Sequence, residues 1–231
     1  MGARRLKEVK FLTLFKSWKA TLLRLLKRRP SENSSDTSTT SKPARLVGIC
    51  VGHSREKDLG ARSISGVPEW TFNVRVAVHI RRLLLRYGIE SIIYDEYHGQ
   101  GYTAAMTWLA HTLKADRVDL AIELHFNAAT ESAAGCEMLY YQGSAPGKRL
   151  ASCLQKEVLS AYTTKDRGIK PVKRFSRGGA FLVKTKCPAV ICEPFFGTNE
   201  RDWEIFSQTR TVLAKAYARG IKTFLSEVPD K

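Results

Sequence analysis

Residues 120–127 read LAIELHFN, a segment typical of the central strand of an α/β sheet. Its first part, residues 120–125, is mostly apolar, as expected for a strand covered by helices on both faces. Similar strands are predicted on either side of it along the chain, with helical patterns between them. The strand candidates are 46–51, 91–94, 120–125, 137–141, 180–183 and 189–193. The helix candidates are 68–87, 103–115, 146–161 and 198–226.

This alternation of strands and helices predicts an α/β fold. We expect a single domain over residues 45–228, with a central, mostly parallel or mixed sheet of about six strands flanked by helices. The helix over 68–87 has a good start, because Pro68 suits a first turn and Glu69 lies beside the positive end of the helix dipole. Hydrophobic residues make up 43% of the 231 residues, which is enough for a sizeable core.

The ends of the predicted strands carry the side chains that can do chemistry. In open α/β sheets, sites lie at the carboxyl ends of the strands. His53 follows the first predicted strand, His125 ends the third and Glu193 ends the last. Glu69 begins the helix after the first strand and reaches the same edge of the sheet. Two histidines and two carboxylates are therefore expected to converge there.

Two histidines and one glutamate with an open fourth position form a ligand set typical of catalytic zinc. Zinc bound in this way lowers the pKa of a water toward neutrality, and a second carboxylate can accept the proton of that water. The four residues lie far apart along the sequence, so their spacing alone is weak evidence. Taken singly, His125 is more readily explained as a hydrogen-bonded histidine of the core.

Four stretches resemble, in order, the zinc-dependent N-acetylmuramoyl-L-alanine amidases that degrade cell walls in bacteria and phages. The stretches are VGHSREKDLGA (51–61), EWTFNVRVAVHIRRLLLRYG (69–88), ELHFNAATESAAGCEMLYY (123–141) and PAVICEPFFGTNERD (188–202). The lack of a secretory signal and the EPFFGTN segment favour the phage or prophage lysins within that family. The resemblance implies hydrolysis of the amide bond between the lactyl group of N-acetylmuramic acid and the L-alanine of the peptide stem in peptidoglycan.

By this resemblance, His53, Glu69 and His125 match the ligands of one catalytic zinc ion. Glu193 matches the family's catalytic glutamate, which removes the proton of the attacking water. The chain departs from the family directly after the first histidine, where Ser-Arg-Glu-Lys stands at residues 54–57 in place of the usual glycines. Because of this difference, we expect the loop to change how the substrate fits more than how zinc is bound.

Two further residues are predicted to bind substrate. Asn127 follows the third strand, where it either anchors a loop or touches substrate. Arg177 lies in a basic stretch over residues 165–186, and a guanidinium there can hold the carboxylates of the peptide stem. A run of charged residues of this kind also often forms a solvent-exposed face without a ligand. Glu123 shares a strand face with His125, so it is expected either to orient that ligand or to pair with a basic group.

The N-terminal region has a separate character. Residues 1–45 hold 12 Lys and Arg against 3 Asp and Glu, and the apolar positions within residues 4–29 recur at helical spacing. Residues 1–29 therefore predict a basic amphipathic helical tail, which suits an anionic membrane or envelope surface. A helix packed on its own domain is the alternative. The Ser-, Thr- and Pro-rich residues 30–44 predict a flexible linker.

The composition disfavours several classes of protein. No apolar run approaches the roughly 18 residues of a membrane-spanning helix. Five scattered cysteines without a CxxC pair argue against a disulfide framework or a cysteine-rich zinc module. The net charge of +16 indicates a polyanionic partner, but nucleic acid is disfavoured because no nucleic-acid-binding motif accompanies the charge. We expect a protein made in the cytoplasm that acts at the cell wall or in the periplasm.

Two other functions stay open at this point. A zinc peptidase that cuts within the peptide stem would use the same metal chemistry. A catalytically silent module that only binds cell wall or membrane is disfavoured, because every expected ligand and the catalytic carboxylate are present. The sequence carries no indication of the oligomeric state.

Overall fold

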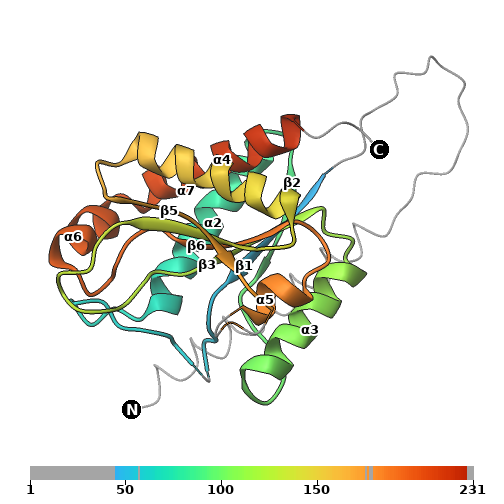
Figure 1. Cartoon of the computed structure of the whole chain (residues 1–231), viewed down its shortest axis with the longest axis horizontal. Coiled ribbons are helices and arrows are strands. Elements are labelled where there is room, and N and C mark those ends of the chain that lie inside the picture. The colour runs from blue at the N-terminus through green and yellow to red at the C-terminus, as the bar shows by residue number, and fades with distance from the viewer. Residues whose placement is uncertain (1–44, 57, 175, 177–178, 228–231) are drawn as a thin grey trace, which may run out of the picture. The chain divides into compact units, whose positions relative to one another are not determined.

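The computed structural model describes the following parts of the chain: residues 45–56, 58–174, 176 and 179–227. The predicted tail over 1–29, the predicted linker over 30–44 and Arg177 lie outside these residues. The described part has the predicted α/β fold, with a six-stranded mixed sheet between helices (Figure 1).

The six strands place three predicted site residues at one edge of the sheet. The strands are β1 (Leu46–Val51), β2 (Glu90–Tyr94), β3 (Leu120–Leu124), β4 (Cys136–Tyr141), β5 (Asp166–Val172) and β6 (Ala189–Glu193). They lie in the order β2-β1-β3-β6-β4-β5. β4 is antiparallel to β6, and the other neighbouring pairs are parallel. The carboxyl ends of β1, β3 and β6 are therefore adjacent, as the prediction for His53, His125 and Glu193 requires.

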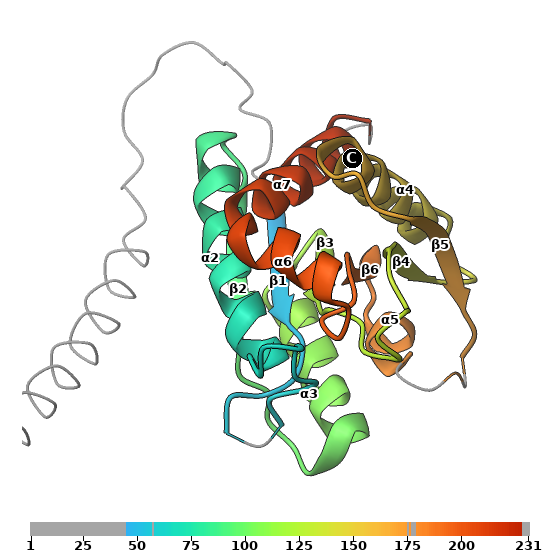
Figure 2. The same ribbon diagram turned by 90° about the vertical axis from the view of Figure 1, so that its left-hand side faces the viewer.

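Helices cover both faces of the sheet. They are α2 (Glu69–Arg86), α3 (Gly101–Ala115), α4 (Ala145–Ala161), α5 (Ala180–Lys184), α6 (Glu200–Gln208) and α7 (Arg210–Ser226). Figure 2 shows α2, α4, α6 and α7 on one side of the sheet and α3 and α5 on the other. Within the described residues, none of these helices is long and apolar enough to cross a membrane.

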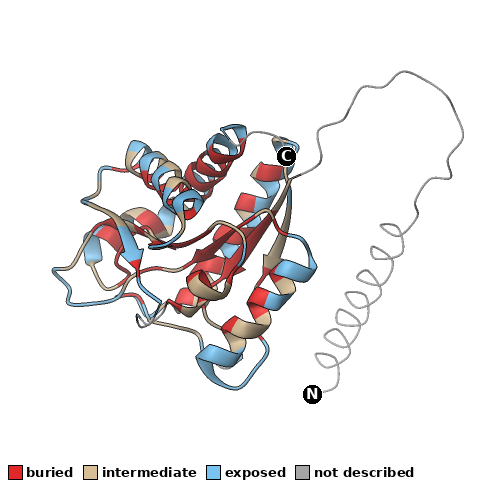
Figure 3. Cartoon of the chain, turned by 45° about the vertical axis from the view of Figure 1, so that its right-hand side comes forward, coloured by how far each residue is buried: buried red, intermediate tan, exposed pale blue. Residues whose placement is uncertain are grey.

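Alternate strand residues enter two separate cores. Val47, Ile49 and Ile122 pack with residues of α2, α4, α6 and α7 in the larger core. Cys50 and Ala121 pack with residues of α3 and α5 in the smaller core. The period of two is that of a strand whose faces are both covered, and Figure 3 shows the sheet as largely buried.

Two predicted elements are wrong in type or extent, and one strand was missed. The predicted strand over 180–183 is the short helix α5, because a four-residue apolar run fits a buried helix turn as well as a strand. Strand β5 (Asp166–Val172) was not predicted, since it is an edge strand with charged residues and Pro171. The predicted helix over 198–226 is divided into α6 and α7 at Thr209, whose hydroxyl bonds the backbone oxygen of Ile205.

Candidate active site

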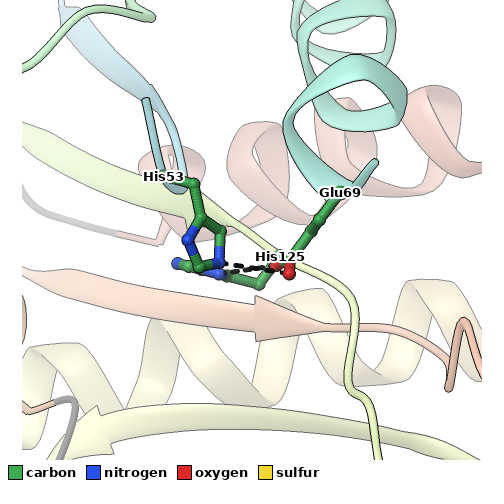
Figure 4. Close-up of side chains that lie close together, drawn as sticks. All are labelled: His53, Glu69 and His125. Carbon is green, nitrogen blue, oxygen red and sulfur yellow. Dashed lines mark hydrogen bonds and ion pairs between the residues drawn. The ribbon is translucent and has the colours of Figure 1, made fainter. Parts of the chain in front are cut away.

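Three side chains from separate parts of the chain meet at the carboxyl edge of the sheet. His53 follows β1, His125 follows β3 and Glu69 opens α2, and Figure 4 shows the carboxylate of Glu69 directed at the two imidazoles. One ligand atom from each residue lies within 4.8 Å of the other two. We call these three residues the His-Glu-His cluster. The sequence predicted this convergence, and the structure shows it.

The backbone conformation lets the three side chains of the cluster approach one another. His53 has a φ of 69°, a left-handed conformation that non-glycine residues seldom adopt and that recurs at functional sites. A Cβ on Gly60 would stand 2.5 Å from Cδ2 of His53 and 2.8 Å from Oε2 of Glu69. A Cβ on Gly52 would overlap the ring of His125. Glycine at both positions lets the chain pass directly against the cluster.

Glu69 is held in place by backbone and side-chain donors together. Its Oε1 accepts from the backbone N–H of Phe126, and its Oε2 accepts from that of Ala61. The same oxygens lie 2.8 Å from Nδ1 of His125 and 3.1 Å from Nε2 of His53. Burial raises the pKa of Glu69, but the hydrogen bonds and charges of the two histidines outweigh burial and lower the pKa to about 2. Glu69 is therefore an anion at neutral pH.

His53 is oriented from its far side by Asp58. Nδ1 of His53 lies 2.9 Å from Oδ2 of Asp58, which leaves Nε2 facing Glu69. Asp58 is itself fixed, because its backbone pairs with that of Ser54 and its Oδ1 accepts from the N–H of Gly60. This is how the unusual loop after the first histidine closes. The role of Asp58 was not predicted, although an Asp-x-Gly turn five residues after a histidine is a signal that would have drawn attention to it.

His125 has a corresponding partner in Glu123. Nε2 of His125 lies 3.4 Å from Oε2 of Glu123, while Nδ1 faces Glu69. The buried hydroxyl of Tyr97 donates to Oε1 of Glu123 at 3.4 Å. Glu123 therefore contacts the histidine, as one of the two interpretations of its strand position predicted. Burial lowers the pKa of His125, but the bonds to Glu123 and Glu69 outweigh it and raise the pKa well above its usual value.

Glu193 ends β6 beside the cluster and has a different environment. Its Oε2 is buried and has no hydrogen-bond partner among the described residues. Burial raises its pKa to about 8, with further contributions from the charges of Glu69, Glu137 and Glu123 that the charge of His125 only partly offsets. Glu137 is its cross-strand neighbour on β4. Cys192 faces the opposite side of the strand and packs in the larger core, as predicted.

One cavity is lined by both histidines of the cluster together with Glu123 and Glu193. It has a volume of about 600 Å³. The rest of the wall is mainly apolar and comes from α3, the segment before it and the strands; it includes Tyr97, Tyr102, Ala105, Met106, Leu139 and Ile191. A pocket of this size, with a few convergent polar groups in an apolar wall, is typical of a small-molecule or substrate site. We call it the site cavity.

Of the two predicted substrate-binding residues, only Asn127 is among the described residues, and it lies away from the lining of the site cavity. Asn127 follows β3, and its Nδ2 donates to Oε1 of Glu137 at 2.7 Å. Oε2 of Glu137 accepts from Nε of Arg167, so Asn127 belongs to a hydrogen-bonded chain that joins the ends of the strands. It is absent from the described lining of the site cavity. Arg177 lies outside the described residues.

The donor set fits a divalent metal ion. The cluster offers two imidazole nitrogens and one carboxylate oxygen, each at a separate corner of a small triangle. Each histidine has a carboxylate on its other ring nitrogen, Asp58 for His53 and Glu123 for His125. Histidines that ligate metals nearly always have a partner of this kind. Imidazole and carboxylate together suit zinc.

The chain is similar to one curated sequence and to several solved structures. The chain is 28% identical to the YqiI protein of Bacillus subtilis over 161 residues, which cover 68% of this chain and 73% of that protein. The solved structure of the N-acetylmuramoyl-L-alanine amidase AmiC2 of Nostoc punctiforme matches with a TM-score of 0.69 at 22% identity, over 81% of this chain and 100% of that one. The catalytic domain of the CD27L endolysin, which targets Clostridia difficile, matches with a TM-score of 0.66 at 25% identity, over 78% of this chain and 97% of that one.

The sequence profile of one enzyme family matches nearly the whole described domain. That family is N-acetylmuramoyl-L-alanine amidase, and the match covers residues 47–223, from β1 into α7. It includes every member of the His-Glu-His cluster and Glu193. The resemblance found in the sequence is thereby confirmed: the chain belongs to the N-acetylmuramoyl-L-alanine amidase family and is a peptidoglycan amidase by class.

Proposed function

We propose that the chain hydrolyses the amide bond between the lactyl group of N-acetylmuramic acid and the L-alanine of the peptide stem, with one zinc ion held by His53, Glu69 and His125. One observation carries this proposal: both histidines of the His-Glu-His cluster line the same cavity as Glu193, whose Oε2 is buried and has no hydrogen-bond partner among the described residues. Family membership supports the choice of bond.

The proposed chemistry divides between the metal and Glu193. Zinc in the cluster would supply a Lewis acid that polarises the amide carbonyl and stabilises negative charge on its oxygen. Glu193 would accept a proton from the attacking water at its free Oε2. As the water oxygen bonds to the carbonyl carbon, the carbon–nitrogen bond breaks, and Glu193 returns the proton to the nitrogen of the departing L-alanine. A carboxyl with a raised pKa suits both halves of this transfer.

The remaining residues of the site would hold these groups in position. Asp58 and Glu123 fix the two imidazole rings, so that one nitrogen of each faces Glu69. The apolar wall of the site cavity, which includes Met106 and Ile191, would keep bulk water from the reacting bond. Asn127 and Arg177 stay predictions of substrate contact, and the bond from Asn127 to Glu137 favours an anchoring role for that amide.

We further propose that the enzyme acts at the cell wall in phage-type lysis of a host cell. The likeness to the CD27L endolysin catalytic domain and the basic composition of residues 1–29 support this role. Deletion of residues 1–29 is then expected to weaken lysis of intact cells from outside and binding to anionic vesicles. Unchanged lysis and unchanged vesicle binding would contradict a role for the tail.

The products on purified peptidoglycan test which bond is cut. The proposed reaction releases stems with a free L-alanine amino terminus and creates no new reducing sugar ends. Amino termini of residues further along the stem would show a peptidase. Binding to peptidoglycan without any product, in a preparation that contains zinc, would show a module that only adheres to the wall.

A further inference from the structure

A second groove lies on another face of α3. It has a volume of about 620 Å³. Residues of α3 spaced three or four apart form one wall, as expected for a single helix face: Thr103, Thr107, Ala110, His111 and Lys114. The other wall comes from α5 and the chain on either side of it, through Ala180, Val183, Lys184, Arg174 and Lys186. We call this the basic groove.

The basic groove is lined by positive charges that no acidic side chain of the described residues pairs with. Four of its residues are cationic, namely Lys114, Arg174, Lys184 and Lys186, and no Asp or Glu lines it. None of the four forms an ion pair with another described residue. Like charges that converge on one groove repel each other, so an anion bound between them would relieve that repulsion.

The basic groove lies close to the site cavity. Helix α3 lines both: Tyr102, Ala105 and Met106 face the site cavity, and Thr103 and Thr107 face the groove. Helix α5 packs against α3, and the two helices lie side by side in Figure 1. The two sites are therefore separated by about one helix diameter, roughly 10 Å. A polymer held in the site cavity can span that distance.

We propose that the basic groove binds the free carboxylates of peptide stems in peptidoglycan, on stems next to the one being cut. This inference rests on the proposed function, which makes peptidoglycan the bound polymer. Stem carboxylates are anions that recur along that polymer, and lysine ammonium groups bind carboxylates without demanding a fixed geometry. The groove would thereby add affinity for the polymer, while the bond to be cut is selected in the site cavity.

Binding without turnover tests the proposal. The substitution Glu193→Gln keeps the substrate intact. In this background, the groove variant carries three further changes together: Lys114→Gln, Lys184→Gln and Lys186→Gln. The matched control changes three exposed lysines of α4 and α7 to Gln: Lys148, Lys156 and Lys215. Both triple variants lose the same net charge. Affinity is measured by co-sedimentation with peptidoglycan that has been stripped of phosphodiester polymers.

We expect the groove variant to bind at least about tenfold more weakly than the control variant at low salt, with a smaller difference in concentrated salt. Amidation of the peptidoglycan carboxylates is expected to abolish the difference between the variants. Equal affinity of the two variants would overturn the proposal. A difference seen only on walls that retain phosphodiester polymers would overturn the assignment to stem carboxylates.

A failure of the groove proposal can be told apart from a failure of the proposed reaction. Turnover of a short soluble muramoyl peptide by the groove variant, with Glu193 restored, is expected to stay within about twofold of wild type, because such a substrate is too short to reach the groove. If wild type released no L-alanine amino termini, the proposed function would fail while the binding comparison still stood. If turnover of the short substrate fell together with binding, the groove would belong to the cutting site, and the assignment to neighbouring stems would be wrong.

Discussion

Oδ2 of Asp58 lies 2.9 Å from Nδ1 of His53, and this contact decides which nitrogen of the histidine faces Glu69. The loop after the first histidine, which departs from the family pattern, thus still carries a carboxylate to the histidine. Its closed form depends on the backbone pairs between Ser54 and Asp58. The substitution Asp58→Asn removes the charge and keeps the shape of the side chain.

We expect Asp58→Asn to weaken zinc binding by about 10- to 100-fold, as the loss of such a partner does at other histidine–metal sites. Competition with a chromophoric chelator measures the affinity. Glu56→Gln is the control, because Glu56 is an exposed carboxylate of the same loop. Equal loss of affinity in both variants would mean that net charge matters and the contact with His53 does not.

Glu123 is expected to orient His125 in a similar way. Glu123→Gln should weaken zinc binding by about tenfold or more and change the visible spectrum of the cobalt-substituted enzyme, since the ligand field depends on the orientation of the ring. Tyr97→Phe removes only the hydroxyl that donates to Glu123, so a smaller effect in the same direction is expected. An unchanged cobalt spectrum in Glu123→Gln would contradict the positioning role.

Gly60 offers a test with a close internal control. Gly60 has a φ of +74° and Gly66 a φ of +75°, so alanine strains the backbone at both positions by a similar amount, about 1–2 kcal/mol. Only at Gly60 would the added Cβ meet His53 and Glu69, since nothing lies within 4 Å of that position at Gly66. Gly60→Ala should therefore lose zinc affinity, while Gly66→Ala should lose only stability. Thermal unfolding and chelator competition separate the two effects.

Zinc affinity should rise with pH through the neutral range. Burial lowers the pKa of both histidines, but the neighbouring carboxylates outweigh burial and raise the pKa above its ordinary value in each. The metal must displace these protons, so affinity is lost as the pH falls below the raised pKa values. Glu69 contributes no proton, because its pKa is about 2. Calorimetry in buffers of different ionisation enthalpy should show release of up to about two protons per zinc near neutral pH, and no release would contradict this account.

Glu193 should destabilise the zinc-free fold as the pH rises. Its pKa is about 8 in the fold, against an ordinary value of 4.5. The folded state therefore holds a proton that the unfolded state releases, so this contribution to stability is complete below about pH 4.5 and is lost as the pH rises to about 8. Glu193→Gln removes the titration and should gain about 1–3 kcal/mol of stability relative to wild type between pH 5 and pH 8.

Denaturant unfolding of the zinc-free protein at several pH values measures that gain. Glu131→Gln, an exposed carboxylate on a loop, is the control and should show no such trend. The same Glu193→Gln variant should lose about 10²- to 10⁴-fold in turnover while it still binds zinc. A variant that is less stable than wild type at pH 8 would contradict the assigned environment of Glu193.

The sequence predicted that the side chains of the His-Glu-His cluster converge because they stand at the ends of buried strands or at the start of the next helix. The predicted bounds of β1 and β6 match the structure; His53 lies two residues beyond β1, and Glu193 is the last residue of β6. Parallel strands of one sheet bring their carboxyl ends together whatever lies between them in the sequence, so the convergence with His125 required no knowledge of the loops.

The parts that were missed depend on tertiary structure. Strand β5 has little apolar character, because it pairs with one neighbour only and its face is half exposed. The contact between Asp58 and His53 depends on how one loop closes, and the bond from Tyr97 to Glu123 joins segments 26 residues apart. The spacing of apolar residues along the sequence does not predict such contacts. The apolar run of α5 fits either kind of element until its neighbours are known.

The requirement for one zinc ion in amide hydrolysis is tested by titrating zinc into chelator-stripped enzyme and following the release of L-alanine amino termini from purified peptidoglycan. We predict no activity without metal, a linear rise to one zinc per chain and a plateau beyond it, with none of this activity in His53→Ala, Glu69→Ala or His125→Ala. Full activity in the stripped enzyme, or cleavage elsewhere in the stem, would contradict the account.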